Sequence, residues 1–193
     1  MDFLHKVEAI IVADTDGQRL FAKYFNPNLD AGSNTMEGCD WPIEKQASFE
    51  AAIYQKAIEA KRTSYCTGDG DMLLHDQFSV LYEVEPELMF FVVGKKGENE
   101  LVLSQVLMSL LESIQELLGM QSGQMSKREL LENFMTLVLV VDEMIDDGII
   151  LELNSSSIVA EVMPYVGKEN GGRGDDVEKA LHTFSKFVRQ GAN

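Results

Sequence analysis

Residues 7–25 read VEAIIVADTDGQRLFAKYF, and this stretch decides what kind of sheet the chain forms. The apolar run 7–13 leads into the turn sequence Asp14-Thr15-Asp16-Gly17, and a second run with aromatic content, 19–25, closes at Asn26-Pro27. Two such runs joined by an Asp-Gly turn predict a β-hairpin. Because a tight connection joins antiparallel strands, the sheet is expected to be antiparallel and the fold α+β rather than doubly wound.

Further strands and helices follow this hairpin. Residues 28–40 are turn-rich and predict a loop. A helix is expected over 42–62, with proline in its first turn and Phe49, Ile53 and Ala57 at i, i+4 and i+8.

The middle of the chain predicts the rest of the sheet and a long helix. Residues 72–75 and 78–84 form one bent strand or two, and the fully apolar run 88–93 is typical of a central strand. A helix is expected from about 98 to 118. Its apolar face comprises Leu103, Val106, Leu107, Leu110, Ile114, Leu117 and Leu118.

A capping box, Ser126 with Glu129, predicts the start of the next helix. That helix is apolar nearly all round from Leu130 to Ile145, so we expect it to be buried on every face. Gly148 is its expected C′ residue.

Residues 154–193 predict a linker and a further helix. The Gly-rich stretch 168–175 predicts a flexible linker. A second capping box, Asp175 with Glu178, opens a final helix whose one side carries Val177, Leu181, Phe184 and Val188. We therefore expect a domain over 1–153 and a helical C-terminal extension over 154–193.

The composition excludes several classes of protein. The chain has 193 residues, 45% of them hydrophobic, and a net charge of −16 from 32 acidic and 16 basic residues. Such a surface repels nucleic acid and anionic lipid, so neither is an expected direct partner. No secretory signal opens the sequence, which favours a cytoplasmic protein.

The acidic stretch VVDEMIDDGIILE, 140–152, is the strongest candidate for chemistry. An EF-hand loop starting at Asp142 fails, because Met144 occupies position 3, glycine falls at position 7 and Leu153 occupies position 12. Asp142 and Asp146 are expected on one helix face at i, i+4, but beside a glycine stop they are solvated rather than a catalytic acid pair. Acids at a helix C-terminus oppose the helix dipole by roughly 0.3–1 kcal/mol each, which suggests that they pair with a basic partner surface.

Metal and cofactor chemistry have no other candidate. His5, His75 and His182 are dispersed without the spacing of a zinc site. Residues 171–174, GGRG, lack the Lys-Ser/Thr of a phosphate loop. We expect no cofactor, no metal and no enzymatic activity.

Surplus apolar residues point instead to a subunit of a complex. Leu101 and Met108 fall opposite the core face of the 98–118 helix, and the 130–145 helix has more apolar surface than one core needs. Exposed apolar patches of this kind mark protein interfaces, whereas full enclosure in a compact core is the alternative interpretation.

Three blocks of sequence carry a resemblance to a known family. VEAIIVADTDGQRLFAKYF, SVLYEVEPELMFFVVGKKGENELVL and RELLENFMTLVLVVDEMIDDGIILE together resemble the small chains of vesicle-coat adaptor complexes, and most closely the zeta chains of coatomer. The resemblance runs from about Val7 to Val162 in one order.

This resemblance implies a longin-type fold, a five-stranded antiparallel sheet flanked by helices on both faces. It implies a non-enzymatic subunit that binds the trunk of a gamma-coatomer large subunit alongside the other coatomer subunits, and that supports Golgi-to-ER and intra-Golgi transport. Attachment to Golgi membrane and coated vesicles would be peripheral and indirect, through an Arf-type GTPase.

The expected partner-binding residues combine an apolar and an acidic set: Leu101, Met108, Leu111, Leu137, Leu139 and Met144, with Asp142, Asp146 and Asp147. A clathrin-adaptor sigma chain that reads dileucine signals is the first alternative. Its pocket wall would fall near Leu88 and Leu111, but Arg128 stands where an apolar residue belongs, so we expect no dileucine binding. A hydrolase using the 142–152 carboxylates is the second alternative.

Overall fold

The computed structural model describes residues 6–25, 43–63, 71–120 and 124–166. Five strands form one antiparallel sheet in the order β2-β1-β5-β4-β3. The strands are β1 (Val7–Asp14), β2 (Arg19–Tyr24), β3 (Asp71–His75), β4 (Phe78–Val84) and β5 (Leu88–Lys95). The predicted opening hairpin and the predicted central strand are both confirmed, and residues 72–84 form two strands rather than one.

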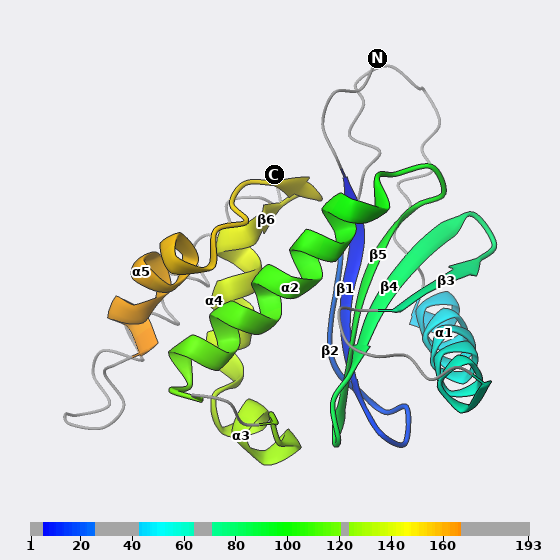
Figure 1. Ribbon diagram of the computed structural model, residues 1–193, viewed down its shortest axis with the longest axis horizontal. Helices are drawn as coiled ribbons and strands as arrows, with labels where there is room; N and C mark the ends of the chain where they lie inside the picture. The colour runs from blue at the N-terminus through cyan, green and yellow to red at the C-terminus, as the bar shows by residue number, and fades with distance from the viewer. Residues whose placement is uncertain (1–5, 26–42, 64–70, 121–123, 167–193) are drawn as a thin grey trace.

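Helices cover both faces of this sheet (Figure 1). One face carries α1 (Ile43–Thr63), and the other carries a layer of α2 (Glu100–Leu117), α4 (Phe134–Met144) and α5 (Ser155–Val166). A short helix, α3 (Lys127–Glu132), precedes α4. The α+β class and the five-stranded sheet between helices are therefore as expected.

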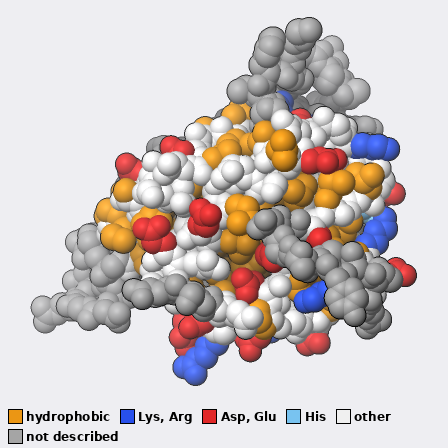
Figure 2. All heavy atoms as spheres, in the orientation of Figure 1, with side chains coloured by type: hydrophobic (Ala, Val, Ile, Leu, Met, Phe, Trp, Pro, Cys, Tyr) orange, Lys and Arg blue, Asp and Glu red, His pale blue; other side chains and the backbone are white. Residues whose placement is uncertain are grey.

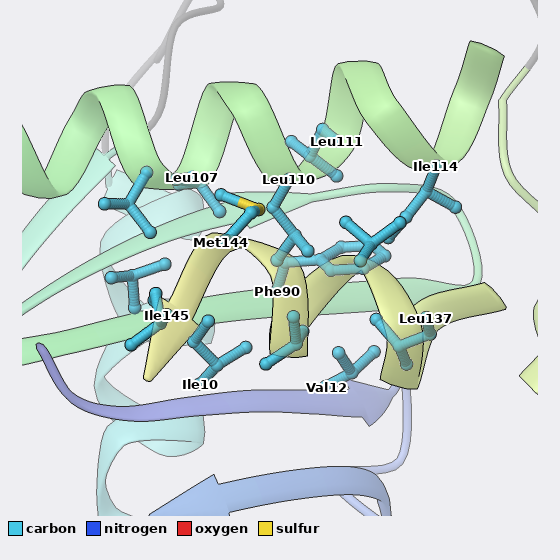
Figure 3. Close-up of a cluster of buried hydrophobic side chains, with 14 of the residues drawn as sticks. Ile10, Val12, Phe90, Leu107, Leu110, Leu111, Ile114, Leu137, Met144 and Ile145 are labelled. Atoms are coloured by element: carbon cyan, nitrogen blue, oxygen red, sulfur yellow. The ribbon is translucent and has the colours of Figure 1, made fainter. Parts of the chain in front are cut away.

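The alternation of side chains along the central strands creates two separate cores. On the α1 side, Phe49, Ile53 and Ala57 of the helix pack over Ile11 and Phe91. The larger core lies on the other side of the sheet, where the buried residues of α2, α4 and α5 meet those of β1, β4 and β5. Figure 3 shows part of this second core, with Ile10, Val12 and Phe90 rising from the sheet toward Leu110 and Leu137.

The 130–145 segment departs from the single helix that its apolar pattern predicts. The capping box of Ser126 and Glu129 is present, but the helix it opens stops at Glu132. Asn133 has φ −115° and ψ 33°, and its Nδ2 donates to the carbonyl oxygen of Glu129 at 2.9 Å. An asparagine that bonds to nearby backbone competes with the helical ladder, which explains the break.

The expectation that this segment is buried on every face is also wrong. Leu131 is 47% exposed and Met135 is 54% exposed, whereas Leu130, Leu137, Val140, Val141 and Met144 are buried. The segment is therefore buried only where it faces the sheet and the neighbouring helices. Leu131 and Met135 form an exposed apolar strip near the start of α4.

The segment after residue 153 contributes to the larger core. Helix α5 packs on α2 and α4, and its Ile158 and Val162 are buried with theirs. The domain boundary at 153 stays a prediction. The predicted loop at 28–40, the linker at 168–175 and the final helix lie outside the described residues.

Asp14 ties the first turn to the helical layer. The N–H of Gly17 donates to the Asp14 carbonyl at 3.0 Å, and Gly17 then adopts φ +77°. The Asp14 carboxylate accepts backbone N–H groups from Asp16 and Gln18 through Oδ1 at 3.0 and 2.8 Å. Its Oδ2 accepts from Nζ of Lys127 at 2.7 Å, and the Asp14 side chain is only 6% exposed.

These contacts set the titration of Asp14. Burial raises the pKa of Asp14, but the hydrogen bonds from Lys127, Gln18 and Asp16 together outweigh it and hold the pKa below its usual value. A carboxyl whose pKa is lowered by folding stabilises the folded state above its unfolded pKa, about 3.9. This stabilisation is lost as the pH falls from there through the folded-state pKa.

We predict that Asp14→Asn lowers the free energy of unfolding by about 1.5–3 kcal/mol at pH 7, the range for hydrogen bonds to a charged group. The difference from wild type should shrink as the pH falls below about 4, because the wild-type carboxyl is then protonated as well. Urea unfolding from pH 7 to pH 3 measures both effects. A difference that stays constant with pH would show that the charge of Asp14 does not contribute.

Candidate interaction surface

The acidic stretch after α4 forms a two-stranded hairpin, not the end of a helix. β6 (Ile145–Asp146) pairs with β7 (Ile149–Ile150) across Asp147 and Gly148, whose φ angles are +47° and +82°. Two positive φ angles in a two-residue Asp-Gly loop indicate a type I′ turn. The expectation that Gly148 is a helix C′ residue is therefore wrong, since α4 ends at Met144 and Ile145 is already extended.

This hairpin attaches to the start of the sheet. The N–H of Val7 donates to the Gly148 carbonyl at 2.8 Å, and Lys6 forms a bridge with Ile149. Val7 also pairs with Gly94 near the end of β5, six residues before α2 begins at Glu100. The hairpin and the first turn of α2 therefore lie at one end of the sheet, as Figure 1 shows for β6 and α2.

The start of β1, at this end of the sheet, carries a buried carboxylate. Glu8 is at an irregularity in the β1–β5 register, with its side chain 4% exposed and Oε1 3.5 Å from Nζ of Lys95. Burial raises the pKa of Glu8 above its ordinary value, and the charge of Lys95 offsets only part of that effect. Glu8 therefore contributes least to stability at neutral pH, where it is ionised.

The nine predicted partner-binding residues separate into three groups in the fold. Leu101 is 79% exposed, and Asp146 and Asp147 are exposed in the hairpin. Met108, Leu139 and Asp142 are half-buried. Leu111, Leu137 and Met144 are buried in the larger core, where Figure 3 shows them among the side chains of α2, α4 and the sheet.

Asp142 has a partner within the chain. Its Oδ1 accepts from Nζ of Lys23 on β2 at 2.6 Å, and that ammonium lies 5.0 Å from the ring centroid of Phe25. Asp142 and Asp146 do not share a helix face, because the helix has ended before Asp146. The expected i, i+4 pair is thus absent, and Asp142 fastens α4 to the sheet edge.

Glu152 has a local structural role as well. Its Oε1 accepts the N–H groups of Leu153 and Asn154 at 2.8 Å each, and Asn154 Oδ1 accepts from Ser157 N at 3.1 Å ahead of α5. Among the described residues, no three His, Cys, Asp or Glu side chains gather in a way that could hold a metal ion. In the acidic stretch, Asp142 thus forms an ion pair, Asp147 lies in a turn, and Glu152 accepts backbone N–H groups ahead of α5.

Leu88 and Leu111, which were expected to line a dileucine pocket, are not accessible to a peptide. Leu88 is fully buried and Leu111 is 6% exposed, both inside the larger core. Arg128 Nε donates to Oε1 of Glu132 at 2.7 Å beside a shallow hollow that Leu131 also lines. This hollow is lined by Glu87, Lys127, Arg128, Leu131 and Glu132, so charged groups surround its apolar surface.

Sequence reasoning missed Leu151, which is 60% exposed just after the hairpin. Its signal was the run Ile149-Ile150-Leu151 following an Asp-Gly turn, where three successive apolar side chains cannot all point inward from a strand. Leu101, Asp146, Asp147 and Leu151 together define what we call the hairpin-end surface. On the face in Figure 2, acidic side chains lie among the hydrophobic ones.

Comparison with known proteins identifies the class of this fold. The family described as clathrin adaptor complex small chain matches residues 6–167, and the chain belongs to this family. In fold it resembles a chain in a homology model of the full-length AP-3 complex in a stretched open conformation, with a TM-score of 0.52, 18% identity and coverage of 93% of this chain and 98% of that one.

Within this class, the chain is similar to coatomer zeta subunits. It is 33% identical to coatomer subunit zeta-1 of Homo sapiens over 186 residues, which cover 96% of this chain and 88% of the relative. It is 30% identical to coatomer subunit zeta of Saccharomyces cerevisiae, covering 82% and 78%. The chain is therefore a small subunit of a multi-subunit coat, and its family is one of coat subunits rather than of enzymes.

Among the residues that the structure describes, no helix is both long enough and apolar enough to cross a bilayer.

We predict that Gly148→Ala destabilises the protein by more than the roughly 1–2 kcal/mol that a left-handed alanine costs. A Cβ at Gly148 would lie 2.7 Å from the carbonyl oxygen of Val7, so backbone must move. Gly119→Ala is the matched control, because Gly119 has φ +68° and nothing within 4 Å of its Cβ position. Urea midpoints measure the difference, and equal losses for both variants would show that hairpin attachment tolerates the added methyl group.

Proposed function

We propose that this chain is the zeta-type small subunit of a coatomer coat and that it binds the trunk of a gamma-coatomer large subunit. In this role it stabilises the large subunit, joins the other coatomer subunits and supports Golgi-to-ER and intra-Golgi vesicle transport. It is cytoplasmic and associates with Golgi membrane peripherally, through the assembled coat and an Arf-type GTPase rather than by its own lipid contacts.

The hairpin-end surface is the observation that carries this proposal. Leu101 lies in the first turn of α2, and Leu151 directly follows the hairpin that carries Asp146 and Asp147. They expose 79% and 60% of their surface. Large apolar side chains left exposed at one end of a domain favour a protein partner. The two aspartates favour a partner with basic side chains around an apolar contact, because opposite charges at the rim of an interface steer association.

The other predicted contacts have different roles in the proposal. Met108 and Leu139 keep part of their surface exposed and remain candidate contacts on the helical layer. Leu111, Leu137 and Met144 act through the core, by holding α2 and α4 in place beneath the surface. Asp142 is a weaker candidate, since binding a partner would compete with its bond to Lys23.

A sigma chain that reads dileucine signals is the alternative, and the burial of Leu88 and Leu111 speaks against it. A pocket there would require the larger core to open.

Co-expression with two trunks tests the proposal. We expect the chain to co-elute one-to-one with a gamma-coatomer trunk in size-exclusion chromatography and not with a clathrin-adaptor large-chain trunk. Co-elution with the adaptor trunk alone would favour the sigma alternative. Elution with neither would overturn the proposed function.

The same complex tests the surface. Leu101→Asp combined with Leu151→Asp should weaken trunk binding at least tenfold, because charges then replace two apolar side chains that the proposed complex buries. Leu131→Asp is the control, since Leu131 is also exposed but lies on α3, away from the hairpin. Isothermal titration measures the affinities. Equal loss in both variants would place the interface elsewhere.

A further inference from the structure

An apolar groove lies at the other end of the helical layer, where α3 and the start of α4 meet the end of α5. Its lining includes Leu131, Phe134, Met135 and Leu139 from α3 and α4, and Tyr165 and Val166 from α5. The groove has a volume of about 210 Å³. Leu131, Met135 and Tyr165 are 47%, 54% and 72% exposed, so the described residues leave these side chains largely uncovered.

The charges around this groove favour a basic occupant. Glu132 lies on its rim, where its bond to Arg128 is an exposed i, i+4 pair of small net strength. The last turn of α5 carries no basic residue, so no side chain of that turn offsets the partial negative charge of the helix end at the groove. A segment with one apolar face and positive charges would complement both features.

The sequence that follows Val166 has this chemistry. Val177, Leu181, Phe184 and Val188 recur at intervals of four, three and four, which is the spacing of one helix face. Lys179, Lys186 and Arg189 add three positive charges, and no acidic residue follows Glu178. This segment thus combines an apolar face with the sign of charge that the groove lacks.

The connection between groove and segment is short enough to bring them together. Val166 lines the groove, and the ten residues 167–176 that follow it include four glycines and span up to roughly 33 Å when extended. A flexible connection of this length gives an effective concentration on the order of 1 mM. A weakly attractive segment therefore occupies the groove of its own chain in preference to that of another.

We propose that residues 177–189 bind the groove between α3, α4 and α5 of the same chain, with Val177, Leu181, Phe184 and Val188 against Leu131, Met135 and Tyr165. Bound there, the segment covers the apolar strip that the break at Asn133 leaves uncovered. The groove is at the opposite end of the layer from the hairpin-end surface, so both surfaces are used at once.

Hydrogen–deuterium exchange of the full chain tests this. Backbone amides of 177–189 should exchange about tenfold more slowly than in Leu181→Asp/Phe184→Asp, the ratio expected when an effective concentration on the order of 1 mM exceeds a dissociation constant of about 0.1 mM. Thr183→Asp/Gln190→Asp carries the same added charge on the opposite side of the expected helix and should retain the wild-type protection. Equal exchange in all three proteins would overturn the proposal.

A variant on the groove side separates docking from helix formation in the segment alone. Met135→Asp should abolish the protection of 177–189, whereas Leu101→Asp, which places the same charge at the far end of the layer, should leave it unchanged. Protection that survives Met135→Asp would overturn the proposal, as would protection that rises with protein concentration, because that would indicate exchange of the segment between two copies. The experiment needs no large subunit, so its outcome is independent of the co-elution result.

Discussion

The burial of β1 on both faces is the constraint on which the rest of this structure depends. All eight residues of the strand are buried, as are seven of the eight in β5 beside it. A strand pair of this kind is stable only if each face is covered by another layer. Helix α1 supplies one cover, and the layer of α2, α4 and α5 supplies the other (Figure 1).

The helical layer opposite α1 consists of α2 and α4 on the sheet and α5 packed outside them. This arrangement explains why α4 is apolar nearly all round. Helix α2 packs on β4 and β5, while α4 lies on the same face toward the edge strand β2, where Phe134 contacts Phe21 and Asp142 binds Lys23. Helix α5 then packs on α2 and α4 together. A helix that contacts a sheet, a neighbour and an outer helix needs apolar residues in three directions. The exposed strip at Leu131 and Met135 is found where this enclosure ends.

The sequence predicted the elements better than it predicted their surroundings. The hairpin over 7–25, the central strand, the long helix and the capping box at Ser126 follow from patterns only a few residues long, and all of them are present. Leu111, Leu137 and Met144 were expected to contact a partner, because their helices have more apolar faces than a sheet alone requires. Helical spacing shows that a face is apolar, but not whether the chain itself supplies its cover, and here the core includes these side chains.

Local signals were ambiguous where two structures share one sequence pattern. Asp147-Gly148 suits both a helix stop and a type I′ turn, and the choice depends on the bond between Gly148 and Val7, 141 residues away. The sequence by itself determined the antiparallel sheet and the order of its main elements, because neighbouring residues set these features. Only the tertiary structure decided the partner of Asp142, the exposure of Leu101 and Leu151, and the groove beside Tyr165. Contacts between distant segments create these features, and no short stretch of sequence records which segments meet.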